Sequence, residues 1–380
     1  MSAARTFALQ EFPIHFSHRP LALVRSPGRV NLIGEHTDYN DGFVFPLAIE
    51  RGTYIAVGPR SDRQVSLYST HFNETATFAL DDLETPVPEW AEYARGVAAI
   101  LQLDGFSLHG FNGVVAADLP VGAGLSSSAS FSLAIARALH VTSGFTWDAT
   151  KMALLCQRVE NEHIGVNCGI MDQLVIAAAR ENQALLIDCR SLATTPASLP
   201  AEAAIVIMDT KKSRTLAGSA YNVRRAQCEA VARFFGVKAL RDVTLPELEA
   251  AKSKLDPLDY QRACHVISEN ARTEKAGSLG TPPAAELGQL MNASHESLRN
   301  DYEVSCDELD EITALARHQP GCFGARMTGA GFGGCAVALV EANKAESFVM
   351  AVTAGYEERF HVKPALYVTR ATAGTSHEML

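Results

Sequence analysis

The sequence predicts an α+β protein with two domains. With 380 residues, the chain is too long for one ordinary core and suits two domains of about 150–200 residues. Hydrophobic residues make up 47% and charged residues 20%, which is the balance of a well-packed soluble protein. Strand and helix patterns mix in the first half, whereas helical patterns dominate most of the second. We place the boundary in the Pro- and Ser-containing stretch 191–200, which gives domains of 1–192 and 193–380.

The first half is expected to begin with short strands and to continue with helices. Apolar runs with polar connections predict a strand and its turn at 21–34 and further strands at 53–58 and 65–69. Apolar residues recur at helical spacing over 90–103, and 113–117 is a plausible buried strand. The segment 119–128 leads into another helix, and a further helix is expected over 148–163, with Gly165 at the position of a C-terminal cap.

The second half is expected to be mainly helical, with strands near its two ends. Strands are predicted at 184–188 and 204–209, on either side of the proposed boundary. Helices should dominate 221–318, with a Gly/Pro-rich break at 277–283. Strands at 325–328 and 335–340 should flank a glycine cluster, and a last strand is expected at 365–369. Residues 371–380 are expected to form a loose tail.

The composition excludes several classes of function. A formal charge of −10 argues against a nucleic-acid-binding surface, which is normally basic. The eight cysteines form no CxxC pair, so neither a zinc site nor a disulfide framework is indicated. The first 16 residues lack the pattern of a signal peptide, and no window approaches the roughly 18 apolar residues of a membrane span. We therefore expect a cytoplasmic protein without nucleic-acid or membrane partners.

The segment 28–40, GRVNLIGEHTDYN, has an unusual density of mixed charge. It places a cation, two carboxylates, an imidazole and an amide between two short apolar runs. Each of these groups needs a partner once it leaves water, so packing alone explains them poorly. The alternative is a polar turn that carries charge because it is solvated. A binding site accounts better for the combination.

The segment 122–128, GAGLSSS, has the properties of a phosphate-binding loop. Small residues let a ligand approach the backbone, and the helix that follows begins with amide groups that lack internal partners. The segment is not a Walker A loop, because no lysine follows the glycines. From this segment alone, a helix start capped by serine is an equally good explanation.

A second glycine cluster and two carboxylates complete the set of candidate features. The segment 329–334, GAGFGG, satisfies GxGxxG, but a strand follows where a dinucleotide-binding fold needs a helix. We therefore favour a glycine loop between strands over a dehydrogenase. Glu160 lies on a predicted helix, where a solvated charge is the ordinary interpretation. Asp172 follows the residues 169–171, GIM, a context that would bury it.

Together, the segments 28–40, 122–128 and 329–334 resemble the three motifs of the GHMP small-molecule kinases. The first is closely similar to the signature of the galactokinases within that family. The resemblance continues in order along nearly the whole chain, through LLIDCRS at 185–191, YNVRRAQC at 221–228, LRDV at 240–243, ENAR at 269–272 and RMTGAGFGG at 326–334.

The resemblance implies both a fold and a reaction. The N-terminal domain would be ribosomal-protein-S5-like and bind galactose and ATP, the C-terminal GHMP kinase domain would be ferredoxin-like, and the active site would lie in the cleft between them. The reaction would be Mg²⁺- and ATP-dependent phosphorylation of the anomeric hydroxyl of α-D-galactose to galactose 1-phosphate, the first committed step of galactose catabolism. It requires a phosphate cradle, a divalent metal, a base and a cation for developing charge. We expect a monomer.

The resemblance also implies roles for single residues. Asp172 matches the catalytic carboxylate, which accepts or orients the anomeric proton, and Arg29 matches the arginine that stabilises charge beside it. The galactose-binding positions would be Glu35, His36, Asp38, Gly169 and Tyr221. The phosphate loop would be Gly122, Ala123, Gly124, Leu125, Ser126, Ser127 and Ser128. Ser128 and Glu160 match the magnesium ligands.

Several interpretations stay open. Trp90 is either close to the adenine or part of the core, and the loop 329–334 either supports the pocket or is a hairpin that needs positive φ. A galactose sensor would bind ATP and sugar but signal through a partner protein, although the full-length serine segment 126–130 favours catalysis. A kinase for another sugar, such as N-acetylgalactosamine, would differ in whether its pocket accepts a bulky 2-substituent.

Overall fold

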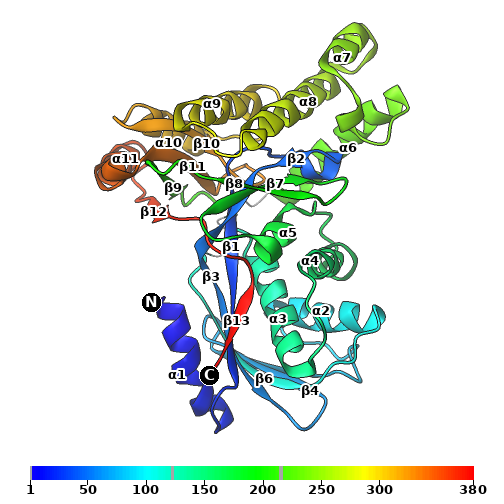
Figure 1. Ribbon diagram of the computed structural model, residues 1–380. Helices are drawn as coiled ribbons and strands as arrows, with labels where there is room; N and C mark the ends of the chain where they lie inside the picture. Colours follow the sequence, from blue (N-terminus) through cyan, green and yellow to red (C-terminus); the bar gives the residue numbers. More distant parts are fainter. Residues whose placement is uncertain (1, 121–123, 214–216) are drawn as a thin grey trace.

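The structure is a computed structural model that describes residues 2–120, 124–213 and 217–380 (Figure 1). The α-helices are α1 (Ala3–Phe16), α2 (Glu92–Leu103), α3 (Ser127–Ser143), α4 (Ala149–Arg158), α5 (Met171–Ala178), α6 (Ala217–Phe235), α7 (Leu245–Ala251), α8 (Pro257–Ser278), α9 (Ala284–Asn300), α10 (Asp307–Arg317) and α11 (Ala345–Phe360). Short helical turns are η1 (Asp38–Asn40), η2 (Glu89–Ala91), η3 (Val159–Ile164), η4 (Leu240–Asp242), η5 (Lys252–Lys254) and η6 (Ala342–Lys344).

The strands form three sheets. They are β1 (Ala22–Asn31), β2 (Phe43–Val44), β3 (Pro46–Pro59), β4 (Gln64–Ser69), β5 (Glu74–Ala79), β6 (Phe111–Ala117), β7 (Gln183–Asp188), β8 (Thr194–Ser198), β9 (Ala203–Asp209), β10 (Cys322–Met327), β11 (Cys335–Glu341), β12 (Ala365–Thr369) and β13 (Ser376–Met379). The sheet orders are β13-β1-β3-β6-β4-β5, β10-β11-β9-β12 and β2-β7-β8. Neighbouring strands are antiparallel except β4 and β6, which are parallel.

The six-stranded sheet of the N-terminal half is covered on both faces. Successive side chains of a strand point to opposite faces, and Tyr54 and Ala56 pack beneath α1 whereas Ile55 and Val57 pack with the helices of the other face. Figure 1 shows α1 on one side of the sheet and α2, α3, α4 and α5 on the other. Because both faces are buried, β3 is apolar along most of its length rather than alternating.

The two halves share a core. On the four-stranded sheet of the C-terminal half, Val206 and Met208 face a cluster built from its helices. Ile205 and Ile207 point the other way and join a third cluster, which also contains Leu32 from the end of β1. This shared apolar layer fixes the N-terminal strands against the C-terminal half, and so fixes the side chains that both halves contribute to the site.

The predicted α+β class is confirmed, with differences at the ends of the chain. The loose tail predicted at 371–380 is wrong, because β13 pairs with β1 from Ala22↔Met379 to Arg25↔Ser376. The stretch 191–200 contains strand β8, which pairs with β7, and the division at 192/193 stays a prediction. Gly165 has a φ of 85° and ends the π-helical turn η3 that continues α4, as its expected role as a cap requires.

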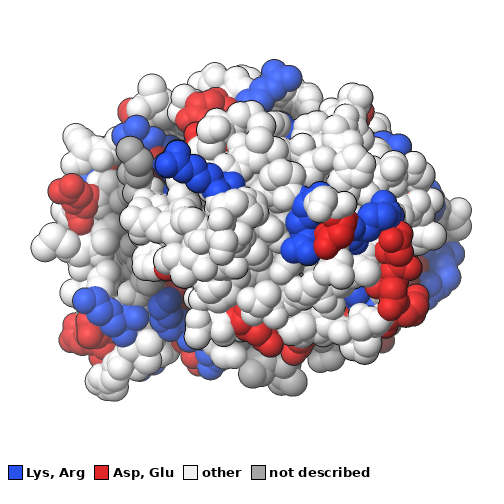
Figure 2. All heavy atoms as spheres, turned by 90° about the horizontal axis from the view of Figure 1, so that it is seen from below, with Lys and Arg blue, Asp and Glu red and all other residues white. Residues whose placement is uncertain are grey.

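The outer surface of the described residues gives no sign of a specialised polyanion or membrane contact. Lys/Arg and Asp/Glu side chains are interspersed among uncharged residues on the face shown in Figure 2. Within the described ranges, every helix is too short or too polar to span a membrane.

Candidate active site

A cavity of about 580 Å³ is lined by residues from both halves of the protein. The N-terminal half contributes the end of β1, the turn after it, the start of α3 and the segment 165–172. The C-terminal half contributes Tyr221 and Asn222 of α6 and Gly329 and Ala330 of the loop between β10 and β11. The predicted residues that line it are Arg29, Glu35, His36, Asp38, Gly124, Ser126, Ser127, Ser128, Gly169, Asp172 and Tyr221.

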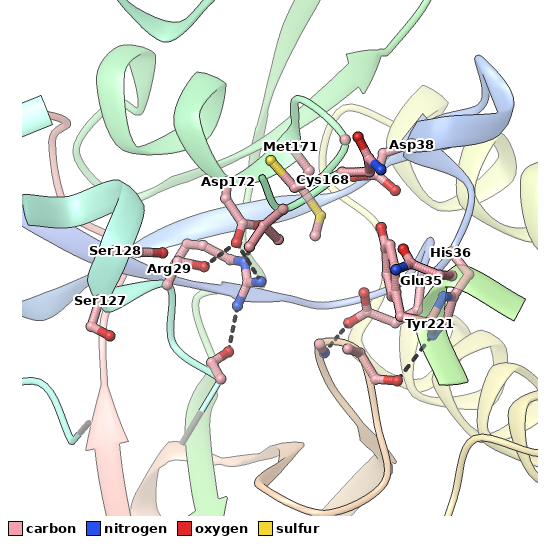
Figure 3. Close-up of a pocket in the computed structure, with 18 of the residues that line it drawn as sticks. Arg29, Glu35, His36, Asp38, Ser127, Ser128, Cys168, Met171, Asp172 and Tyr221 are labelled. Atoms are coloured by element: carbon pink, nitrogen blue, oxygen red, sulfur yellow. Dashed lines mark hydrogen bonds and ion pairs between the residues drawn. The ribbon is translucent and has the colours of Figure 1, made fainter. Parts of the chain in front are cut away.

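Arg29 and Asp172 form a two-point ion pair in this cavity (Figure 3). Nε of Arg29 donates to Oδ1 of Asp172 at 2.7 Å and Nη2 donates to Oδ2 at 2.9 Å. Arg29 lies where the pairing of β1 with β3 shifts register, and Asp172 lies in the first turn of α5. Burial acts to lower the pKa of Arg29, but the charges of Asp172 and Glu35 outweigh it and the pKa is raised.

The expected burial of Asp172 is only partly correct. Its side chain is 29% exposed whereas that of Arg29 is 7% exposed. The apolar neighbours of Asp172 pack inward from the start of α5, since Ile170 and Met171 are buried. The carboxylate itself faces the cavity, so it can reach a bound ligand while the guanidinium holds it from behind (Figure 3).

The serine loop connects this ion pair to the start of α3. Gly122 and Ala123 lie outside the described residues. The Gly124 carbonyl accepts from Nη1 of Arg29 at 2.6 Å, and Ser126 donates its hydroxyl to Oδ2 of Asp172. Leu125 does not line the cavity; its side chain is buried in the shared core.

The serine-cap explanation of this loop is wrong for Ser126. Ser126 is the N-cap of α3 with a φ of 60°, but its side chain makes no capping hydrogen bond. Its hydroxyl is used by Asp172 instead. The first amides of α3 are therefore free of a side-chain cap at the wall of the cavity, which is the arrangement that binds anions at a helix N-terminus.

Glu35 is held by the glycine loop of the C-terminal half. It is 2% exposed, and its Oε1 accepts from Gly329 N at 2.7 Å, Thr328 Oγ1 at 3.0 Å and Arg326 Nη1 at 3.3 Å. The loop has positive φ at Gly329, Gly331, Phe332, Gly333 and Gly334. Both interpretations of this loop are therefore confirmed, because it is a hairpin between β10 and β11 and also supports the pocket.

His36, Asp38, Gly169 and Tyr221 lie together at the other end of the cavity from Ser127 and Ser128 (Figure 3). The His36 ring lies 5.6 Å from the Tyr221 ring, and a β-carbon on Gly169 would overlap the Asp38 carboxylate. Burial raises the pKa of Asp38 to about 7, and the charges of Asp172 and Glu35 add to the shift. Gly169 is thus needed for space rather than for contacts of its own.

Ser128 and Glu160 are placed as Mg²⁺ ligands should be. Glu160 is 7% exposed and its Oε1 has no hydrogen-bond partner. Burial, and after it the charge of Asp172, raises the pKa of Glu160, and Ser128 hydrogen-bonds to it. A buried carboxylate oxygen without a partner costs free energy that a cation would recover. Mg²⁺ commonly uses one or two protein ligands with phosphate oxygens and water, and the described residues contain no cluster of three or more acidic, His or Cys side chains.

Trp90 packs against the N-terminal core and is not among the residues that line the cavity. Its Nε1 donates to Glu74 at 2.9 Å, and its ring stacks on that of Phe72 with centroids 5.9 Å apart. The core interpretation is thus supported by its contacts, and a position near the adenine stays a prediction.

Sequence reasoning missed the residues that support the site from α8. Glu269 of α8 accepts from the Gly34 amide at 2.9 Å, and His265 lies 3.1 Å from the Glu35 carbonyl. Both side chains are fully buried. The ENAR segment at 269–272 was the available signal, since a charged motif within a helix that packs into the core needs buried partners. Cys168 and Met171, which line the cavity, were also missed as site residues.

Comparison with known proteins agrees with this arrangement. The galactokinase galactose-binding signature matches residues 10–59, the GHMP kinase N-terminal domain matches 92–180, and the GHMP kinase C-terminal domain matches 279–358. A galactokinase of Roseiflexus sp. is 43% identical over 97% of this chain and 96% of its own, and one of Chloroflexus aurantiacus is 44% identical over 96% and 95%.

A solved structure extends the agreement to the fold. Lactococcus lactis galactokinase complexed with galactose matches 97% of this chain and 98% of its own, with a TM-score of 0.92 and 36% sequence identity. The predicted two-domain GHMP kinase fold is therefore confirmed. Because the matches span nearly the full length of the chain and include the galactose-binding signature, this chain belongs to the galactokinase family of the GHMP kinases and is a kinase.

Proposed function

We propose that the protein transfers the γ-phosphoryl group of ATP to the anomeric hydroxyl of α-D-galactose, giving galactose 1-phosphate and ADP. The observation that carries the proposal is the Arg29–Asp172 ion pair. It lies between the uncapped start of α3 and the group formed by His36, Asp38 and Tyr221 (Figure 3). A phosphate site and a polyol site on either side of a carboxylate match what a sugar kinase needs.

In this proposal, Asp172 accepts or orients the proton of the anomeric hydroxyl. Ser126 and Arg29 together engage both of its oxygens, so the carboxylate has a fixed direction. Arg29 stabilises the negative charge that develops as the phosphoryl group moves toward the sugar oxygen, and the amides at the start of α3 do the same for the donor.

Asp38, Glu35, His36 and Tyr221 would bind the galactose hydroxyls, with Gly169 leaving room for Asp38. Buried acceptors of this kind reject an analogue that leaves one of them without a partner. Mg²⁺, held by Ser128, Glu160 and ATP oxygens, would neutralise phosphate charge. We further propose that the enzyme is a cytoplasmic monomer.

A coupled assay for ADP release tests the function. We expect turnover with galactose and ATP, and little with glucose, which differs at one hydroxyl. A chain that bound both galactose and ATP without turnover would be a sensor, and the proposal would fail. In a sugar panel, faster turnover of N-acetylgalactosamine than of galactose would instead assign the enzyme to that substrate. Mass measurement in solution tests the monomer.

A further inference from the structure

A continuous series of hydrogen bonds runs from the cavity wall into the C-terminal half. Nε2 of His36 lies 3.2 Å from the Ala330 carbonyl and Nδ1 lies 2.8 Å from the Tyr39 hydroxyl. That hydroxyl lies 2.7 Å from the hydroxyl of Tyr302, which in turn lies 3.2 Å from Sγ of Cys228. His36 and Ala330 line the cavity, whereas Tyr302 and Cys228 are fully buried.

The carbonyl at one end fixes the direction of every bond. A carbonyl oxygen can only accept, so Nε2 of His36 carries a proton. Burial, and after it the neighbouring His265, lowers the pKa of His36 to about 3, so the ring is neutral and Nδ1 is an acceptor. Tyr39 gives its single proton to Nδ1, so Tyr302 must donate to Tyr39, and Cys228 must donate to Tyr302.

All three donors keep their protons at neutral pH. Burial raises the pKa of Cys228 to about 11 and the pKa values of Tyr39 and Tyr302 well above their ordinary range. The series is therefore complete in one direction only. The opposite direction would need a proton on Nδ1 and would leave Nε2 facing the Ala330 carbonyl as one acceptor against another.

We propose that Tyr39, Tyr302 and Cys228 are positioning residues that hold His36 in a single tautomer and ring orientation at the galactose end of the cavity. The inference rests on the proposed function. The His36 ring lies 4.7 Å from the Tyr302 ring and 5.6 Å from the Tyr221 ring, so aromatic contacts restrict its rotation as well.

Loss of this order would reach the sugar site through the glycine loop. With Nε2–H of His36 bound to Ala330, the adjacent Gly329 amide is held where it donates to Glu35. Cys228 lies on α6, the helix that also supplies Tyr221. The series thus connects the turn after β1, the loop before β11 and helix α6, and its effect should fall on galactose rather than on ATP.

Single-atom variants test the series with little change in packing. Tyr39→Phe should raise the galactose KM about fivefold, because one buried hydrogen bond is worth about 1 kcal/mol. Tyr302→Phe should raise it about twofold and Cys228→Ala less, since each acts one step farther from His36, and Cys228→Ser should restore it. The ATP KM and kcat should change less than about twofold. Tyr68→Phe, which removes an exposed hydroxyl bonded to Asn73, is the matched control.

Nitrogen-15 NMR of histidine-labelled protein tests the tautomer without any turnover. Assigned by its loss in His36→Gln, His36 should show the Nε2–H tautomer at pH 7 in the wild type and lose this pure state in Tyr39→Phe. An Nδ1–H tautomer in the wild type, or a folded Tyr39→Phe variant with unchanged galactose KM, would overturn the inference. Absence of galactose turnover in the wild type would instead refute the proposed function, and the NMR measurement would still test the series.

Discussion

Asp172 is the single side chain on which the proposed chemistry depends most. Replacement of Asp172 by Asn keeps its size but removes the charge that Arg29 and Ser126 engage. We expect kcat to fall by at least about 10³-fold, because a positioned base commonly contributes 10²–10⁴. ATP binding, measured by calorimetry, should persist because the start of α3 is unchanged. Asp62→Asn removes a similar two-point pair with Arg60 at the surface and should leave kcat unchanged. A D172N enzyme with most of its activity would remove Asp172 from the mechanism.

Asp38 should make stability depend on pH. Its pKa is about 7 in the folded protein, raised from 3.8 by burial and then by Asp172 and Glu35. The folded state therefore holds a proton between those values that the unfolded state has lost, so this residue lowers stability increasingly as pH rises from 4 to 7. Asp38→Asn removes the effect. Its Tm relative to wild type should be higher at pH 8 than at pH 4.5 by roughly 2 °C or more, while its galactose KM rises. A Tm difference that does not vary with pH would contradict the assignment.

At this scale, the sequence indicates which residues matter but not which ones meet. The mixed charges of 28–40 stood out because each needed a partner, and Arg29, Glu35, His36 and Asp38 do line the cavity. The partner of Arg29 lies 143 residues away. No local pattern encodes that pairing, and only the resemblance to a family connected them. The roles given to the individual residues stay predictions.

At the scale of elements, the segment before α5 is shaped around the turn η1. Gly169 leaves space for the carboxylate of Asp38, and an alanine there would overlap it. Gly169→Ala should therefore displace Asp38 and raise the galactose KM by at least about tenfold, with a lower Tm. The double variant Gly169→Ala with Asp38→Ala should recover the Tm, because the clash is gone, but not the KM. Thermal unfolding and steady-state kinetics of both variants would show this, and an unchanged KM in G169A would refute the spatial role.

Elements with a regular apolar pattern were predictable, and irregular ones were not. The helix expected over 148–163 is α4 with its π-helical turn, and the strand expected at 335–340 is β11. Helix α1 was missed because its buried residues Ala4, Ala8 and Phe12 alternate with exposed Phe7 and Ile14, which leaves no clear apolar face. Strand β13 has the sequence SHEM, which has little strand propensity of its own, and exists through its pairing with β1.

At the scale of the whole molecule, two domains could be predicted but their joint was hidden. Length and composition gave the class, whereas the shared core depends on contacts between Leu32 and Ile207, which are distant in sequence. Charged groups add to that joint: Arg241 of η4 pairs with Asp188 at the end of β7 and donates to the Asp41 carbonyl at 2.9 Å. These contacts surround the sugar-binding turn, so the position of that turn is a property of both halves.

The C-terminal strand provides a test of how the whole molecule is held together. β13 pairs with four residues of β1, Arg5 of α1 pairs with Glu378, Arg137 of α3 donates to His377 at 3.0 Å, and Thr375 donates to the Ile176 carbonyl at 3.0 Å. A chain ending at residue 374 loses these contacts and leaves β1 as an exposed edge, at a cost of about 1 kcal/mol per buried hydrogen bond. Its Tm should fall by roughly 5 °C or more.

The same truncation should leave the chemistry nearly intact. Arg29 lies beyond the paired part of β1 and is held by Asp172 and Gly124, which do not contact β13. At 25 °C, kcat should therefore remain within about twofold of wild type if the fold persists. A chain ending at residue 379, which loses only the bond from Leu380 N to the Leu21 carbonyl at 3.0 Å, is the control and should keep its Tm. Equal Tm values for the 374- and 379-residue chains would show that residues 375–379 behave as a free tail and that β13 does not stabilise the sheet.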